Sequence, residues 1–283
     1  MSLAQLLPES VDNGVLRVAQ VAGRSTLLNA RASDPVKYLI PQQRGEAVWA
    51  YTTTYGGGLV SGDHIQLSIH AEEQARLFIG TQASTKVYKR KALNQEVHQD
   101  IDFYCGADSL VISLPDPLVC FAGAQFRQQQ RFYCHPSSSV FALDCFTAGR
   151  IARDERWAFA SLISHMRFFI DDVCVVDDPM FLQNLTHTSI ADRMGLYNIF
   201  GSVIITGEAF ADLRRKLQQR IINSSSSDRA SLDKACIESI SPISHGCIWR
   251  FAAYDIASMF EHILTSVDTC KAFMGGAPWR RRA

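Results

Sequence analysis

Two glycines with the spacing of a phosphate-binding loop are the first candidates for chemistry in this chain. Four residues separate Gly57 from Gly62, as in the P-loop pattern, but Asp63 and His64 follow where that pattern requires Lys-Ser/Thr. A carboxylate there would repel the phosphate that the lysine normally attracts. The segment also lies between two strand-like patterns. We therefore predict no nucleotide binding and expect the glycines to supply positive φ angles in a turn.

Histidines and a carboxylate beside this turn are the second candidates. His64 and His70 fall on one face of an alternating segment, next to Asp63. The three could form the metal site of a hydrolase on a β-sheet scaffold, while solvated strand histidines are the competing interpretation. Two further pairs offer only two ligands each for a metal such as nickel: Cys134-His135 and His245-x-Cys247.

No nucleophile stands in a recognisable catalytic motif. The chain has no G-x-S-x-G elbow, and its eight cysteines include no C-x-x-C pair. We expect the cysteines to be reduced and mostly buried, including Cys174 in its apolar run. The acidic pairs 171–172 and 177–178 fit solvated turns better than acid–base catalysis. The residues alone therefore favour a binding protein over an enzyme.

Short strands punctuated by glycine and proline are predicted for the first half of the chain. Polar and apolar residues alternate strictly over 64–70, which places Ile65, Leu67 and Ile69 on one sheet face. Because helices do not intervene, we expect a predominantly antiparallel β architecture. The other predicted strands are 15–21, 47–53, 75–81, 97–105, 109–114, 125–134, 140–145, 157–163, 166–176 and 245–253.

Helices are predicted in the second half of the chain. In the last of them Asp255 can cap the start, and Gly275-Gly276 can end it. Gly195 is placed to end the first. The serines 224–227 are expected to form a flexible connector. The predicted helices are 181–194, 207–223 and 255–273.

Composition limits the class of protein. Of the 283 residues 47% are hydrophobic and 20% charged, which allows one β-rich domain over 1–283 with a sizeable core and a flexible 1–13. Lys plus Arg equals Asp plus Glu at 28, so no nucleic-acid partner is indicated. The N-terminus does not resemble a secretory signal, and no apolar run reaches the roughly 18–20 residues of a membrane span. We expect a cytoplasmic protein with no membrane partner.

Four segments carry more specific patterns. Residues 56–63 read GGGLVSGD and residues 81–88 read TQASTKVY. Residues 114–126 begin with LPDP, and residues 147–157 begin with TAGR and end in Trp. Together these segments resemble the signature motifs of the UreD (UreH) family of urease accessory proteins. Asp154-Glu155 stands where that family carries Gly-Glu, so a left-handed turn there would lack its glycine.

The resemblance implies a fold and a role. The implied fold is predominantly β, a β-solenoid-like stack of strands with a few C-terminal helices. The implied role is that of a non-enzymatic chaperone, a scaffold that binds the urease apoprotein. Through the helical accessory protein UreF it would recruit the nickel-carrying GTPase UreG. No intrinsic cofactor is expected, and nickel would be present only transiently during its insertion into urease.

The resemblance also suggests roles for individual residues. It implies a polar internal passage for nickel, lined by Thr81, Ser84, Thr85 and Asp144. The alternative is that these four satisfy backbone groups inside a β stack. The signature turns are expected to be structural, with a turn acceptor at Asp63 and an ion-pair or stacking partner at Arg150. Their residues are Gly57, Gly58, Gly62, Asp63, Gly149 and Arg150.

The last helix and the tail are candidates for partner docking. Their apolar stripe would suit an interface if it were exposed, and ordinary core packing is the alternative. The basic tail adds charge at its end. The residues concerned are Ile256, Met259, Phe260, Ile263, Val267, Phe273, Trp279 and Arg280.

Overall fold

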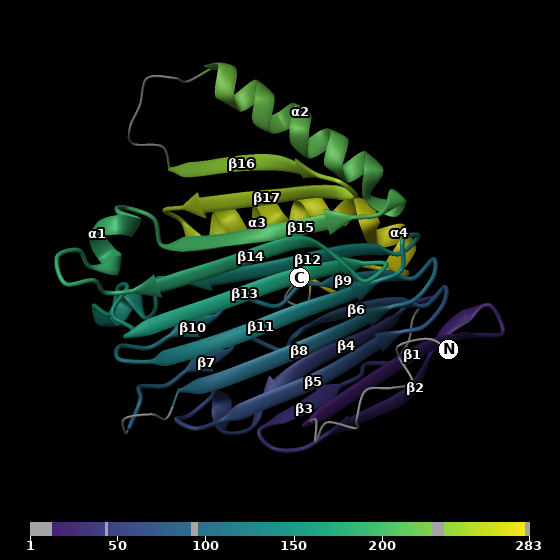
Figure 1. Ribbon diagram of the computed structural model, residues 1–283, viewed down its shortest axis with the longest axis horizontal. Coiled ribbons are helices and arrows are strands. Elements are labelled where there is room, and N and C mark those ends of the chain that lie inside the picture. The colour runs from purple at the N-terminus through teal and green to yellow at the C-terminus, as the bar shows by residue number, and fades with distance from the viewer. Residues whose placement is uncertain (1–12, 43–44, 92–95, 228–234, 281–283) are drawn as a thin grey trace.

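The structure, a computed structural model, describes residues 13–42, 45–91, 96–227 and 235–280. The chain is mostly β-structure, with helices concentrated toward the C-terminus (Figure 1). The prediction of a predominantly β fold with C-terminal helices is therefore confirmed. The predicted flexible segment 1–13 lies, except for its last residue, outside the described residues.

Two sheets face each other. In spatial order the first sheet consists of β14 (Val173–Gln183), β13 (Ser161–Ile170), β11 (Gln125–Cys134), β8 (Val97–Cys105), β5 (His64–Ala71), β1 (Gly14–Val21) and β2 (Arg24–Ala32). The second sheet consists of β16 (Cys236–Ile243), β17 (Gly246–Ala253), β15 (Ile199–Thr206), β12 (Ser139–Thr147), β9 (Leu110–Ser113), β6 (Arg76–Thr81), β4 (Val48–Thr54) and β3 (Val36–Leu39). A short parallel pair joins β7 (Lys86–Val87) to β10 (Val119–Cys120).

The chain passes back and forth between the sheets from β4 to β13. The strands β5, β8, β11 and β13 enter the first sheet, and β6, β9 and β12 enter the second. Neighbours in this part are parallel, with Phe103 of β8 opposite Phe132 of β11. The expected antiparallel architecture is therefore wrong here. A run of short strands shows only where turns fall, whereas a crossover to the other sheet makes each returning strand parallel to its neighbour.

Antiparallel pairs lie at the margins of both sheets. In the first sheet they join β1 to β2 and β13 to β14. In the second sheet they join β3 to β4 and run from β12 through β15 and β17 to β16. The strand pairing establishes that the chain alternates between two sheets. It does not establish a solenoid-like stack, which stays a prediction.

The core between the sheets follows from the alternating strands. Ile65, Leu67 and Ile69 of β5 are buried, as the alternation predicts. Phe103, Phe132 and Phe168 stack across three parallel strands, with ring centroids 4.2 and 4.4 Å apart. This apolar interior holds the two sheets at a fixed spacing and so positions the polar residues placed within it.

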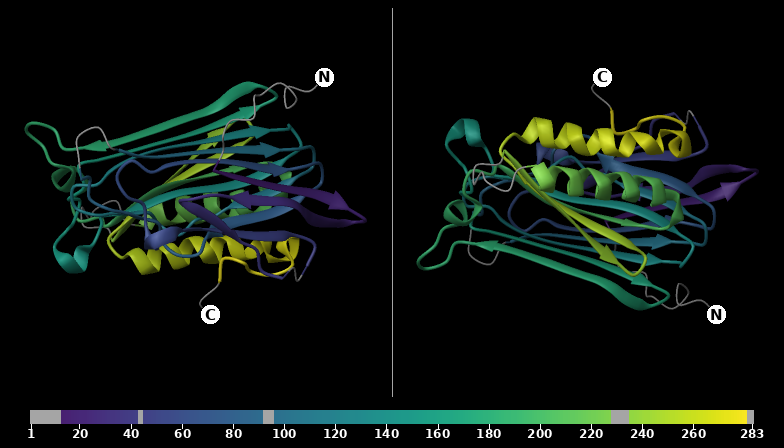
Figure 2. Two further views of the ribbon diagram at one scale, coloured as in Figure 1. Left: turned by 90° about the horizontal axis from the view of Figure 1, so that it is seen from below. Right: turned by 90° about the horizontal axis from the view of Figure 1, so that it is seen from above.

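The helices cover the outer face of the second sheet (Figure 2). They are α2 (Ala211–Ser227), α3 (Ile256–Val267) and α4 (Lys271–Met274). Asp255 caps α3 by accepting a 2.6 Å hydrogen bond from the Ser258 backbone, and Gly275 ends α4 in a left-handed conformation, as predicted. A short 3₁₀ turn at Asp268–Cys270 interrupts the predicted helix 255–273. No helix within the described residues lies on the outer face of the first sheet.

Several predicted boundaries are wrong. Helix 181–194 is mostly absent, because β14 continues to Gln183 and only α1 (Ile190–Met194) is helical. Ser189 and Asp192 cap α1 reciprocally, and Gly195 ends it as expected. The strands predicted at 157–163 and 166–176 are in fact β13 and β14, joined by a turn with positive φ at both residues 171 and 172. Segment 224–227 belongs to α2 and is not a connector.

The cysteines follow the prediction with one exception. Six of the eight are buried and Cys236 is partly exposed. Cys174 is exposed, because it lies on β14 at the edge of the first sheet, where no other described strand pairs with one side of β14. Its apolar sequence neighbours do not reveal that edge position.

Candidate functional site

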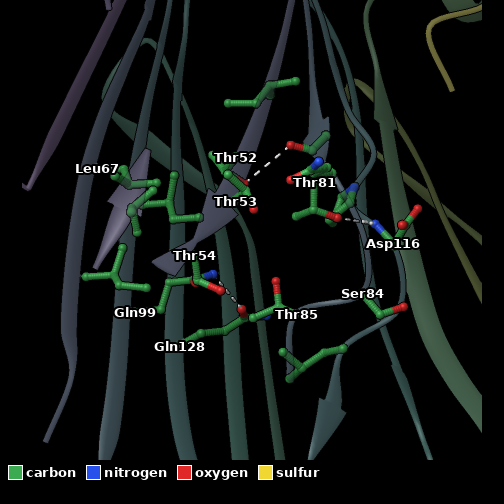
Figure 3. A pocket seen from close by; sticks show the side chains of 18 of the residues that line it. Thr52, Thr53, Thr54, Leu67, Thr81, Ser84, Thr85, Gln99, Asp116 and Gln128 are labelled. Atoms are coloured by element: carbon green, nitrogen blue, oxygen red, sulfur yellow. Dashed lines mark hydrogen bonds between the residues drawn. The ribbon is translucent and has the colours of Figure 1, made fainter. Parts of the chain in front are cut away.

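A cavity of ≈ 380 Å³ lies between the sheets (Figure 3). Apolar residues of the first sheet, Ile65 and Leu67 among them, form one wall. Threonines 52–54 at the end of β4 and the segment 81–86 after β6 supply hydroxyl groups to the other. The cavity reaches the surface at this segment, since Gln82 and Lys86 both line it and are exposed.

All four predicted passage residues line this one cavity. Thr81 ends β6, Ser84 and Thr85 lie in the segment that follows, and Asp144 lies in β12. The hydroxyl of Thr81 also accepts a 2.9 Å hydrogen bond from the Asp116 backbone N–H. Thr81 therefore satisfies a backbone group, as the alternative interpretation expects, and it also lines the cavity.

Asp144 connects the two sheets through hydrogen bonds. Its carboxylate accepts from Gln128 Nε2 at 2.7 Å and from the Ser164 hydroxyl, and both partners belong to the first sheet. Gln128 in turn accepts a 3.3 Å bond from Gln99. Burial raises the pKa of Asp144 to about 6; the two hydrogen bonds oppose the rise and nearby Asp178 adds to it. The site thus holds a carboxyl group whose charge changes near neutral pH.

The partners of Asp144 were missed in the sequence, although a signal exists. In β11 the inward positions are Phe126, Gln128, Gln130, Phe132 and Cys134, so two glutamines occupy an otherwise apolar face. A buried amide must find hydrogen-bond partners inside the protein. Polar residues at inward positions of a strand therefore indicate a polar interior site.

The four signature motifs gather at the open end of the cavity. Strands of the second sheet end there and strands of the first sheet begin there, so the four connecting segments are neighbours. Gly57 of the first motif and Lys86 of the second both line the cavity. Asp116 of the third lines it as well, while Gly149 of the fourth lies in an adjoining groove.

The first motif forms the predicted turn. Gly57 and Gly62 have φ angles of 77° and 88°, which glycine adopts without a steric penalty. Asp63 Oδ2 accepts a 2.8 Å hydrogen bond from the Val60 N–H, as expected for a turn acceptor. Gly58 is extended instead; a Cβ there would lie 2.6 Å from the Tyr88 ring. Gly58 therefore permits the close approach of the second motif.

The fourth motif makes the contacts that we expected of Arg150. The Arg150 guanidinium lies over the Phe121 ring, 3.9 Å from its centroid, and forms an ion pair with Glu155 (Nε to Oε2, 2.8 Å). The hydrogen bond from Arg150 lowers the pKa of Glu155. Asp154 adopts φ 58° and ψ 25°, so the left-handed turn forms although the glycine is replaced.

The hydrolase site is not assembled. Asp63 is engaged by its turn, and His64 contacts Asp100 at 3.0 Å. His70 stacks on Tyr104 at 4.6 Å. His64 and His70 are the two ends of a six-residue step along β5, which spans roughly 20 Å. Within the described residues, no three His, Cys, Asp or Glu side chains are arranged to hold a metal.

Comparison with known proteins assigns the chain to a family. A family model described as the UreD urease accessory protein matches residues 12–282. The chain belongs to the UreD family. It is 32% identical over 268 residues to urease accessory protein UreD of Anaeromyxobacter sp. (strain Fw109-5), a match that covers 95% of this chain and 88% of the relative.

Plant members of the UreD family are similarly related. Identity to urease accessory protein D of Oryza sativa subsp. japonica is 34% over 213 residues, covering 74% of this chain and 68% of the relative. Identity to urease accessory protein D of Arabidopsis thaliana is 29% over 296 residues, covering 94% and 99%. The resemblance read from the four motifs thus extends over nearly the whole UreD chain.

The proposed docking stripe of this UreD chain divides into two parts. Met259, Ile263 and Val267 are buried against the second sheet, so they are core and do not present a surface. Trp279 is buried in the same core and also borders a surface groove. The stripe faces the sheet because β17 and β15 offer it an apolar outer face, which the helix pattern alone does not show. Phe273 is half-buried against the same core.

The remaining docking candidates line a surface groove of ≈ 540 Å³. Ile256 and Phe260 contribute half-buried apolar side chains. Arg280 also lines it and forms ion pairs with Glu261 at 2.8 Å and with Asp268 at 2.7 Å. Ser84 and Asp116 line both this groove and the cavity, so the two spaces of this UreD structure share a wall.

The described helices of this UreD chain are not membrane spans. None of them is both long and apolar enough to cross a bilayer. The most amphipathic of them, α3, spans only residues Ile256–Val267, which is shorter than the roughly 20 residues that a crossing requires.

Proposed function

We propose that this chain acts in urease maturation as a non-enzymatic scaffold between apo-urease and the other accessory proteins during nickel insertion. The observation that carries the proposal is the meeting of the four residues that the family resemblance suggested, Thr81, Ser84, Thr85 and Asp144, in one cavity. Family membership supplies the urease context. Residues brought from two strands and a loop to one polar cavity support a role for that cavity.

The chemistry of the cavity suits a cation in transit. Its polar groups are mainly hydroxyl, amide and carboxylate oxygens, which bind divalent nickel less firmly than imidazole or thiolate. Water occupies about 30 Å³ per molecule, so an ion with six waters needs roughly 200 Å³. The cavity volume of ≈ 380 Å³ accommodates such an ion. Asp144 supplies one interior charge that attracts it. Nickel is then cargo, and no intrinsic cofactor is required.

We assign the partners from the same proposal. The scaffold binds the urease apoprotein and UreF, and through UreF it recruits UreG in the cytoplasm. GTP chemistry belongs to UreG, because the glycine turn here carries Asp63 where a P-loop needs lysine. The groove beside the cavity, with Ile256 and Phe260 on its wall, is the candidate docking surface.

Co-purification tests this function. A tagged chain is expressed with UreF from the same source, and apo-urease is added; we expect a stable three-component complex. The variant I256A/F260A should weaken that complex, because it removes apolar area from the groove. The matched control V173A/F181A truncates two exposed apolar residues on β14 and should leave it intact. A folded chain that binds neither partner would refute the scaffold function.

A further inference from the structure

Exposed cations gather at the open end of the cavity, although the chain as a whole has no net charge. Lys86, Lys89 and Lys91 are exposed in the segment after β6, and Arg153 is exposed in the turn after β12. We call these four the basic rim. In the part of the chain that the structure describes, none of the four forms an ion pair.

Side-chain contacts join the basic rim into one surface. The Tyr88 ring packs edge-on against Phe121, with centroids 5.1 Å apart, and Arg150 lies over the same Phe121 ring. Lys89 crosses Gly123, where its Cγ would lie 3.2 Å from an added Cβ. The segment that carries the lysines and the turn that carries Arg153 therefore share one aromatic contact.

Nearby carboxylates offset only part of the rim charge. Glu155 is paired with Arg150. Asp63 and Asp192 remain charged, and their carboxylates accept hydrogen bonds from the backbone N–H groups of Val60 and Ser189 in their own turns. Asp154 is exposed beside Arg153. The four rim cations still outnumber these three carboxylates, so positive charge is in excess at the mouth of a cavity whose interior carboxyl groups are Asp116 and Asp144.

This arrangement opposes the passage of a cation as long as the rim is uncovered. Lys86 lines the mouth itself, so an approaching divalent ion meets like charge before it reaches the acidic interior. An acidic surface placed on the rim would remove that barrier. Resting on the scaffold function proposed above, we propose that the basic rim docks an acidic surface of a partner protein.

A protein partner fits the rim better than a nucleic acid or a membrane. Four cations are fewer than the roughly 6–10 phosphate contacts of a typical nucleic-acid complex. The half-buried rings of Tyr88 and Phe121 lie beside the rim cations. Aromatic residues are enriched in protein interfaces. Paired charges at such a surface govern the rate of association and its dependence on salt.

Charge reversal tests the rim. The variant K89E/K91E changes two rim lysines that do not line the cavity. Its control, R24E/K216E, makes the same change in net charge at exposed positions on β2 and α2. Affinities for apo-urease, for UreF, for a DNA duplex and for anionic vesicles are measured separately at about 50 mM and about 300 mM NaCl, with melting temperatures to confirm folding.

We expect K89E/K91E to lose about tenfold or more in affinity for one of the two proteins at low salt. The control should stay within about twofold, and the wild-type affinity should fall as salt rises. If the wild type binds and K89E/K91E changes the affinity for neither protein, the rim proposal is overturned while the scaffold function is kept. Binding to neither protein would overturn both. If K89E/K91E loses binding only to a DNA duplex or to anionic vesicles, the rim binds one of those instead of a protein, and the rim proposal is overturned too.

Discussion

Gln128 of the first sheet donates a 2.7 Å hydrogen bond to Asp144 of the second. The bond places a carboxyl group in the apolar space between two sheets, where the charged form is costly. Ser164 donates the second bond, so the carboxylate is held from the opposite sheet at two points. The position of this group is therefore as well defined as the spacing of the sheets.

Asp144 should make stability depend on pH. Burial raises the pKa of Asp144 in the folded state from 3.8 to about 6, so the folded protein retains a proton that the unfolded chain has released. Between pH 4 and 7 the unfolding free energy should fall as pH rises, by roughly 2 kcal/mol from this group. In Asp144→Asn this contribution should vanish. Urea titrations of both proteins from pH 4 to 7 measure the difference, and parallel curves would contradict the prediction.

Ser164→Ala should be harmful mainly when Asp144 is ionised. The variant removes a donor that is buried with its acceptor, and such a loss costs about 1–3 kcal/mol. We expect that loss of unfolding free energy at pH 7 and a smaller one at pH 4, where Asp144 carries its proton in the folded protein. The same titrations serve as the measurement. Equal losses at both pH values would show that Ser164 acts through packing alone.

Gly149→Ala should be among the more damaging glycine substitutions. Its φ is 99°, and a Cβ there would lie 2.7 Å from the Glu155 carbonyl oxygen and 2.8 Å from that of Cys120. Strain and overlap together should cost about 3 kcal/mol or more. Gly23→Ala is the control, since φ is 80° with nothing within 4 Å, and it should cost only about 1 kcal/mol. Thermal unfolding measures the stability of both variants. A similar loss of stability in the two would show that the carbonyl oxygens near Gly149 do not crowd an added Cβ.

Trp279→Ala should separate core from docking surface. Trp279 is 3% exposed and donates a 2.7 Å hydrogen bond to Asp268, so its removal should cost about 3–5 kcal/mol of stability. Ile256→Ala, at the half-buried groove wall, should cost only about 1 kcal/mol. Differential scanning fluorimetry compares them. A stable Trp279→Ala variant that no longer binds UreF would return this residue to the docking surface.

Alternation in the sequence predicted the strands well where one face is apolar and no edge intervenes. β8 and β11 have the predicted bounds, and the residues that end helices, such as Gly195, were also identified. Pairing was not predictable, because crossing between sheets is decided by contacts distant along the chain. The end of the edge strand β14 was assigned to a helix. Its position at the sheet edge, with one face only half covered, weakens the alternation of polar and apolar residues that identifies a strand.

The candidate site was predictable only through the family resemblance, which includes Thr81, Ser84 and Thr85 in one motif and Asp144 outside the motifs. The residue types of the four do not mark a site, and their spacing in the sequence does not predict that they lie together. They are Thr81, Ser84, Thr85 and Asp144. The structure brings them together because parallel strands end at the same edge. Gln128 was within reach of the sequence, as a polar residue on an apolar strand face. The sequence could not show which residues of the α3 stripe are buried and which line the groove, because burial depends on the sheet that packs against the helix.

The central claim is that the cavity serves nickel delivery to urease. The measurement is the nickel content of urease purified from cells that lack this chain and are resupplied with wild type, with Asp144→Asn, or with the control R24E/K216E. We predict full nickel loading with wild type and control, and reduced loading with Asp144→Asn at equal levels of chain and complex. Full loading with Asp144→Asn would contradict the role of the cavity. Full loading without any chain would contradict the account as a whole.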